Sequence, residues 1–167
     1  MHATSQSLFE EHQQFRQPWL WGLMLGILVM LLAILVIIIF QGRDEEGGAQ
    51  AMLGISIGIA IEIGVMILMY CMKLSVRLDA EGLLIRFFPL LKRTIPLDQI
   101  TRWHARTYRP ILEYGGWGIR CGWKGMAYNV SGNQGVQLEL ANGKRVLIGS
   151  QRAEELARAI GESKGQV

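Results

Sequence analysis

The sequence predicts an α+β protein: a transmembrane helical hairpin, then a small antiparallel β-barrel or sandwich that ends in an amphipathic helix. Three observations predict this class. Two apolar runs, residues 18–40 and 51–72, together contain a single charged residue, Glu62. The period of the apolar residues then changes from helical to alternating at Leu74. It becomes helical again after Ser150.

The polar residues 1–17 precede the first run and predict a solvated cytoplasmic lead-in. A short interfacial helix over Ser7–Gln17 is the alternative, although its apolar residues are few. The expected organisation is therefore a lead-in, a hairpin over residues 18–72, and a domain over residues 73–167. That last segment of 95 residues is long enough for one small domain with its own core.

Each apolar run can form a helix of at least 20 residues, which spans a hydrocarbon core of about 30 Å. The first run is longer than the apolar region of a cleaved signal peptide, and no small-residue cleavage site follows it. The loop 41–50 has one basic residue and three acidic ones, whereas Lys and Arg are frequent just after the second run. The positive-inside rule therefore places both termini in the cytoplasm and the loop outside.

Small residues mark faces of both spans. Gly54 and Gly58 stand four residues apart and Glu62 continues that face, while Gly22 and Gly26 form a patch on the first span. Small residues let helix backbones approach closely, so these faces are predicted to pack against a membrane partner or a second copy. A carboxylate at mid-membrane is costly, so Glu62 is expected to be protonated or partnered. A subunit contact, a bond to a backbone carbonyl within the hairpin, and a proton or ion path all remain open.

The segment after the hairpin predicts about seven short antiparallel strands. Leu74–Asp79 and Leu83–Phe88 alternate, and Pro89 ends the second strand. Asn142-Gly143 between two alternating segments predicts a two-residue hairpin turn with positive φ at both positions. A helix from Ser150 to about Glu162 follows, with one apolar stripe that can plug the end of a barrel.

Five runs in the chain carry a resemblance. They are FRQPWLW at 15–21, YGGWGIR at 114–120, AYNVSG at 127–132, GVQLEL at 135–140 and LIGSQR at 147–152. Together with the two spans, they resemble one group of bacterial two-pass membrane proteins with a pleckstrin-homology-like (PH-like) domain. The resemblance covers nearly the whole chain. It implies a PH-like β-domain and a plasma (inner) membrane location, and it brings no catalytic residues.

The sequence has no enzyme signature. The three histidines, His2, His12 and His104, do not have the spacing of a metal-ligand cluster. No Walker loop is present, and the glycines near Trp117 do not complete a dinucleotide-binding pattern. We therefore expect no catalytic residues, no cofactor, no metal and no nucleic-acid partner.

Basic residues are enriched in residues 73–167, which carry 15 Lys/Arg against 8 Asp/Glu, a net charge of +7. Five side chains on two predicted strands are expected to form a cationic patch. They are Arg102, His104, Arg106, Arg120 and Lys124. The patch would contact anionic lipid or a protein partner, with an ordinary solvated face as the alternative. Trp117, between glycines, is expected to be exposed and to take part in such a contact.

These observations lead to one functional hypothesis and two alternatives. The hypothesis is a non-enzymatic membrane accessory or assembly subunit that packs in the bilayer and docks a partner through its PH-like domain. The first alternative is an anionic-lipid-sensing module, and the second is an oligomeric proton or ion path that uses Glu62. The expected partners are membrane lipids and either an integral membrane protein or further copies of the chain.

Overall fold

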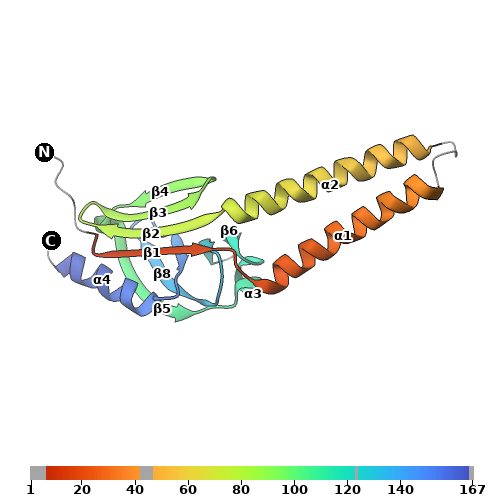
Figure 1. Cartoon of the computed structure of the whole chain (residues 1–167). Coiled ribbons are helices and arrows are strands. Elements are labelled where there is room, and N and C mark those ends of the chain that lie inside the picture. Colours follow the sequence, from red (N-terminus) through yellow and green to blue (C-terminus); the bar gives the residue numbers. More distant parts are fainter. Residues whose placement is uncertain (1–6, 42–46, 123, 166–167) are drawn as a thin grey trace, which may run out of the picture. The chain divides into compact units, whose positions relative to one another are not determined.

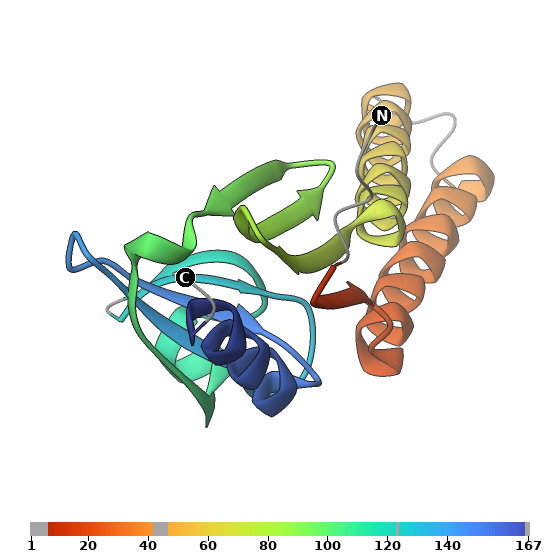
Figure 2. The same cartoon turned by 90° about the vertical axis from the view of Figure 1, so that its left-hand side faces the viewer.

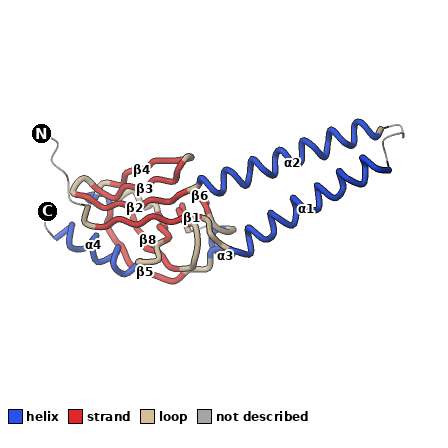
Figure 3. The backbone as a smooth tube through the Cα atoms, in the orientation of Figure 1, coloured by secondary structure: helices blue, strands red, loops and turns tan. Residues whose placement is uncertain are grey.

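The chain forms two compact units, a helical hairpin and a β-domain (Figures 1 and 3). The computed structural model describes residues 7–41, 47–122 and 124–165. The hairpin comprises residues 16–71, and the β-domain combines the residues up to Phe15 with those from Met72 onward. The hairpin is therefore an insertion within the β-domain.

The hairpin consists of α1 (Pro18–Gln41) and α2 (Gly48–Cys71). Helix α2 begins before the span predicted at 51–72, and half of the predicted outer loop, residues 42–46, lies outside the described residues. Both helices are long and apolar enough to cross a membrane. Apolar side chains such as Val29 and Ile61 are exposed along both helices, which distinguishes them from the buried core helix of a soluble protein.

The first strand, β1 (Phe9–Gln14), corrects the prediction for residues 1–17. Within the described part of that segment the chain is not a solvated lead-in or an interfacial helix, because β1 pairs antiparallel with β2 (Lys73–Asp79). The buried positions of β1 are Phe9, Glu11 and Gln13. Two of these three are polar, so the apolar alternation that marks a half-buried strand is missing from the sequence.

Sheet A has the strand order β1-β2-β3-β4, with β3 at Gly82–Phe88 and β4 at Leu91–Ile95. Neighbouring strands are antiparallel throughout. The inward positions of β2, β3 and β4 are almost fully buried. They include Leu74, Val76, Leu78, Leu83, Ile85, Phe87 and Ile95. This is the alternation that the sequence predicts for β2 and β3.

Sheet B has the order β5-β8-β9-β7-β6. Its strands are β5 (Ile100–Thr107), β6 (Gly118–Gly122), β7 (Gly125–Asn129), β8 (Gln134–Leu140) and β9 (Arg145–Gly149). β7 and β9 are parallel, so the prediction of antiparallel strands alone is wrong. The described strands form two sheets and no closed barrel. A 3₁₀ turn, Leu97–Gln99, joins the sheets.

The turn between β8 and β9 lies at the predicted place, but its geometry differs. Gly143 has a positive φ of 76°, whereas Asn142 does not have a positive φ. The N–H of Gly143 donates to the carbonyl of Leu140 at 2.8 Å. The predicted β-hairpin of β8 and β9 is therefore confirmed. The predicted turn type, which needs a positive φ at both positions, is wrong.

Two helices complete the β-domain. Helix α4 (Ala153–Gly165) lies across sheet B against β5 and β8, with Leu156 and Ile160 buried (Figure 2). This helix matches the predicted amphipathic stripe. Helix α3 (Pro110–Tyr114) is not predicted, because five residues are too few to show a helical period.

Candidate functional site

The two membrane-type helices meet along an apolar seam. The less exposed positions of α2 recur at spacings of three and four, as do those of α1. On α2 they include Met52, Ile55, Ile59, Glu62, Met66 and Met69, and on α1 they include Met24, Leu28, Leu31, Leu35 and Ile38. Gly58 and Glu62 therefore both lie in the seam, whereas Gly54, the first residue of the face predicted to carry them, is exposed.

Glu62 is the polar residue of this seam. Its Oε1 atom is buried and has no hydrogen-bond partner among the described residues. The seam positions of α1 are apolar, so that helix offers no side-chain partner. A bond from this oxygen to a backbone carbonyl, one of the three interpretations, is absent. A buried polar atom without a partner costs about 1–3 kcal/mol, so this oxygen is unsatisfied within the hairpin.

The glycines of the spans are not needed for contact between α1 and α2. A Cβ atom added at Gly22, Gly26, Gly54 or Gly58 would meet nothing within 4 Å. Glycine inside a helix costs about 1 kcal/mol relative to alanine. The role of these four glycines in packing against another helix stays a prediction. The open space around them leaves room for such a helix.

Four of the five predicted cationic residues share one face of sheet B, whereas Lys124 lies between β6 and β7, outside the strands. Pairing places His104 opposite Gln137, then Leu147, Ala127 and Arg120, in a single row across five strands. Directly paired residues point to the same face, and alternation adds the two arginines of β5 on either side of His104. However, β5 and β6 are the two edges of the sheet. Three strands therefore separate Arg120 from the β5 cations.

Acidic side chains neutralise most of these cations. Glu113 of α3 pairs with Arg106 at 2.9 Å and with Lys124 at 3.1 Å through the same oxygen. Glu139 of β8 lies 3.9 Å from the guanidinium of Arg102 and 3.3 Å from that of Arg145. Three of the five cations in the expected patch therefore form ion pairs within the β-domain.

Glu113 is ionised at neutral pH. Desolvation raises the pKa of its carboxyl group, but hydrogen bonds from the Arg109 N–H, Arg106 and Lys124 outweigh this and lower the pKa to about 2. Burial lowers the pKa of Arg106, and its contacts with Glu113 raise it by more. Both groups are therefore charged, and their contact holds α3 on sheet B.

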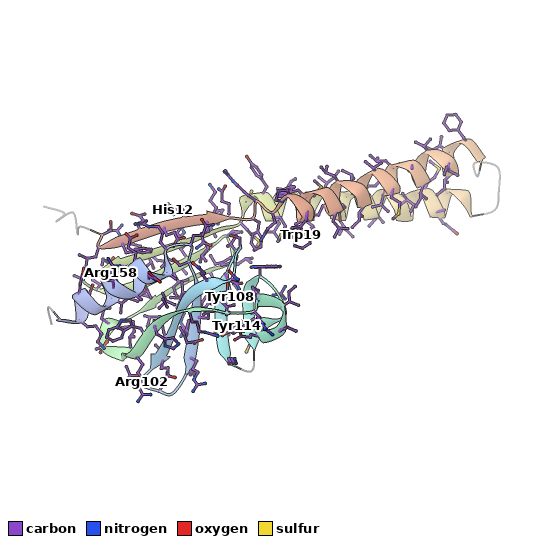
Figure 4. All side chains as sticks on the ribbon, turned by 90° about the horizontal axis from the view of Figure 1, so that it is seen from below. His12, Trp19, Arg102, Tyr108, Tyr114 and Arg158 are labelled. Atoms are coloured by element: carbon purple, nitrogen blue, oxygen red, sulfur yellow. The ribbon has the colours of Figure 1, made fainter. Side chains whose placement is uncertain are left out.

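Tyr108, directly after β5, and Tyr114, the last residue of α3, lie side by side, while Arg102 lies towards the other end of β5 (Figure 4). The ring centroids of Tyr108 and Tyr114 are 6.0 Å apart, edge to face. Asn129 donates to the hydroxyl of Tyr108 at 2.9 Å. Burial raises the pKa of Tyr108 by more than this bond lowers it. These polar atoms belong to the core, and the sequence alone did not single them out.

Trp117 is half-buried and bonded to its own domain. Its Nε1 donates to the carbonyl of Gly132 at 3.0 Å, and its own carbonyl accepts from Nε of Arg120 at 2.9 Å. Both residues therefore stabilise the loop before β6. The proposed contact of Trp117 with a partner stays a prediction.

A buried polar cluster that the sequence did not reveal ties β1 to the start of α4. The carboxylate of Glu11 accepts hydrogen bonds from the hydroxyl of Ser150, from the N–H of Gln151 at 2.9 Å and from the amide of Gln13 at 3.0 Å. The same amide donates to the carbonyl of Gly149 at 2.9 Å. An anion before a helix start is favourable because of the helix dipole. The strand that leads into the hairpin is thereby joined to the C-terminal helix.

A cleft of about 590 Å³ lies between the end of β5 and the first turn of α4. Its charged lining is mixed in sign and includes Arg152, Glu154, Glu155 and Arg158. Arg152 pairs with Glu155 and stacks on the ring of Phe9 at 4.9 Å. Among the described residues no group of three His, Cys, Asp or Glu side chains could hold a metal ion.

No protein-family model, curated protein or solved structure matches this chain. The resemblance to bacterial PH-like two-pass proteins therefore stays a prediction.

Proposed function

We propose that this protein is a non-enzymatic subunit of a larger membrane assembly. Its hairpin packs against another helix in the plasma membrane. Its β-domain, which we take as PH-like, docks a partner on the cytoplasmic side. Two sheets with a C-terminal helix support the PH-like assignment, and the length and exposed apolar surface of α1 and α2 support the membrane assignment.

The observation that carries this proposal is Glu62. Its buried Oε1 has no hydrogen-bond partner among the described residues, in a seam whose α1 positions are apolar. A polar group in a membrane interior is costly without a partner, and such residues mark contacts or pathways. The open space around Gly54 and Gly58 gives a second helix room to approach closely on α2.

The connections between hairpin and β-domain also support a docking subunit. Three residues separate the end of β1 from the start of α1, and Met72 alone separates α2 from β2. Because β1 and β2 are paired, the β-domain is attached at two short connections rather than by one flexible linker. A partner bound to the domain would therefore be coupled closely to the membrane helices.

Affinity purification of the full chain from its native membrane in mild detergent, followed by mass spectrometry, tests the proposal. We expect a stoichiometric membrane partner, or a defined homo-oligomer, that is lost in Gly58→Leu and in Glu62→Leu. Ala60→Leu adds comparable bulk on a different side of α2 and is the matched control. Unchanged partners and oligomeric state in both test variants would rule the proposal out.

The buried oxygen of Glu62 also favours one other function, an oligomeric proton or ion path. Two helices cannot enclose a pathway alone, so this function needs several copies. Reconstituted vesicles test it directly. A flux that disappears in Glu62→Gln supports the path, and the absence of any Glu62-dependent flux removes it. The lipid-sensing alternative has less support at sheet B, because Glu113 and Glu139 already pair with its cations.

A further inference from the structure

The turn between β3 and β4 exposes apolar side chains at its tip. Phe88 and Leu90 are 45% and 56% exposed, with Pro89 between them. Together with Arg86, Leu91 and Lys92 they line a shallow hollow of about 380 Å³. Large apolar side chains gathered on a turn indicate a contact surface rather than an ordinary solvated loop.

Strand pairing places this turn beside both connections to the hairpin. Phe88 is paired with Lys73, and Lys73 is paired on its other side with Gln14. Lys73 is the second residue after the end of α2, and Gln14 is the last residue of β1 before α1. Adjacent strands are about 4.8 Å apart, so Phe88 lies within roughly 10 Å of both points where the chain passes to the hairpin.

Among the described residues, the cations beside the tip form no ion pair with an acidic side chain. Arg86 and Lys92 stand directly opposite each other on β3 and β4, an arrangement that destabilises a sheet when nothing compensates for it. No acidic residue occurs in the sequence between Glu81 and Asp98. None of the ion pairs in the described chain includes Arg86 or Lys92, and Arg86 instead lies over the Phe88 ring at 5.6 Å.

We propose that the β3–β4 turn inserts into the lipid bilayer that the hairpin spans. Phe88 and Leu90 enter the boundary between headgroups and acyl chains, and Arg86 and Lys92 contact lipid phosphates. The inference rests on the membrane assignment in the proposed function. Apolar and aromatic side chains flanked by Lys and Arg are the composition of interfacial segments, and long basic side chains reach the headgroups from there.

Depth-dependent quenching in the full chain tests this contact. Cys71 and Cys121, both free thiols, are first replaced with Ser. Single cysteines at Leu90, Val36 and Asn142 then carry an environment-sensitive fluorophore. Val36 reports on α1, and Asn142 reports on the exposed β8–β9 turn. The labelled chains are reconstituted in vesicles of phosphatidylcholine and phosphatidylglycerol that contain acyl-chain nitroxide lipid.

We expect the probes at Val36 and Leu90 to lose emission to the nitroxide and the probe at Asn142 to keep it. Quenching at Leu90 is expected to weaken when Arg86→Gln and Lys92→Gln are combined. Quenching at Val36 with none at Leu90 would overturn the proposed insertion and leave the hairpin in the membrane. An absence of quenching at both positions would overturn the membrane assignment itself.

Discussion

The β-domain has two basic surfaces, and they differ in where their acidic residues lie. On sheet B, Arg106 and Lys124 share the carboxylate of Glu113. At the β3–β4 turn, Arg86 and Lys92 face each other with no acid in the surrounding sequence. By the number of Lys and Arg residues alone, both surfaces are basic and cannot be told apart. The two surfaces differ in whether an acidic side chain lies close by. Cations beside an acid stabilise the fold, whereas cations without one are available to an anion outside the protein.

The largest expected effect is on the sheet B network. Glu113→Gln removes the charge that Arg106 and Lys124 share, and it leaves Arg106 half-buried beside a neutral group. We expect the free energy of unfolding of the full chain to fall by about 2 kcal/mol, measured by denaturant titration in detergent. The control is Glu81→Gln in an exposed turn, which should change it little. Equal effects of the two variants would contradict a structural role for Glu113.

The same network predicts a pH dependence. The carboxyl pKa of Glu113 is lowered from 4.5 to about 2 in the folded chain. The folded state therefore binds this proton less readily than the unfolded state, and the contribution of Glu113 to stability is complete above pH 4.5 and lost as the pH falls towards 2. The stability difference between the wild type and Glu113→Gln should therefore stay constant above about pH 5 and shrink as the pH falls from 4.5 towards 2. A difference that stays constant over this interval would contradict the pairing.

The β3–β4 turn should respond in the opposite way. Combining Arg86→Gln with Lys92→Gln removes a like-charge cross-strand pair, so stability should stay the same or rise by up to ~1 kcal/mol. The preference for phosphatidylglycerol over phosphatidylcholine among lipids retained by the purified protein should fall by about fivefold for each cation. Native mass spectrometry measures the retained lipids. A loss of stability without a change in lipid preference would mean that Arg86 and Lys92 stabilise the fold and do not bind lipid.

The smallest effect is expected at Arg102. Its side chain is 82% exposed, and its distance to Glu139 is 3.9 Å. Exposed ion pairs of this kind contribute about 0–1 kcal/mol to stability. Arg102→Gln should therefore lower the free energy of unfolding by an amount at the low end of that range and leave the lipid preference unchanged. Thermal unfolding and the same lipid measurement check both expectations. A clear drop in the lipid preference would show that the basic face of sheet B does contact lipid.

The sequence predicts those elements whose side chains repeat with a clear period. The apolar length of α1 and α2, the alternation of β2 and β3 and the stripe of α4 all lie close to where they were expected. Strand β1 was missed because its inward positions include Glu11 and Gln13, which bond to Ser150 and Gly149 near the other end of the chain. A local pattern contains no information about such a distant partner.

The candidate site was less predictable than the fold. The basic residues of β5 and β6 do lie on one face of sheet B, but Glu113 lies on a helix too short to show a period. Its ion pairs depend on how that helix crosses the sheet. The face that carries Gly58 and Glu62 was also narrower than the spacing alone indicates. Both residues are among the less exposed positions of α2, whereas Gly54, about 80° around the helix from Glu62, is exposed.

We expect lipid to contact the β3–β4 turn and not the basic face of sheet B. Site-specific photo-crosslinking in membranes that contain phosphatidylglycerol tests it most directly, with either Phe88 or His104 replaced by benzoylphenylalanine in the full chain. Both side chains are exposed, so the two positions are matched in access. Lipid adducts are expected at position 88 and none at position 104. Adducts at position 104 with none at position 88 would contradict it.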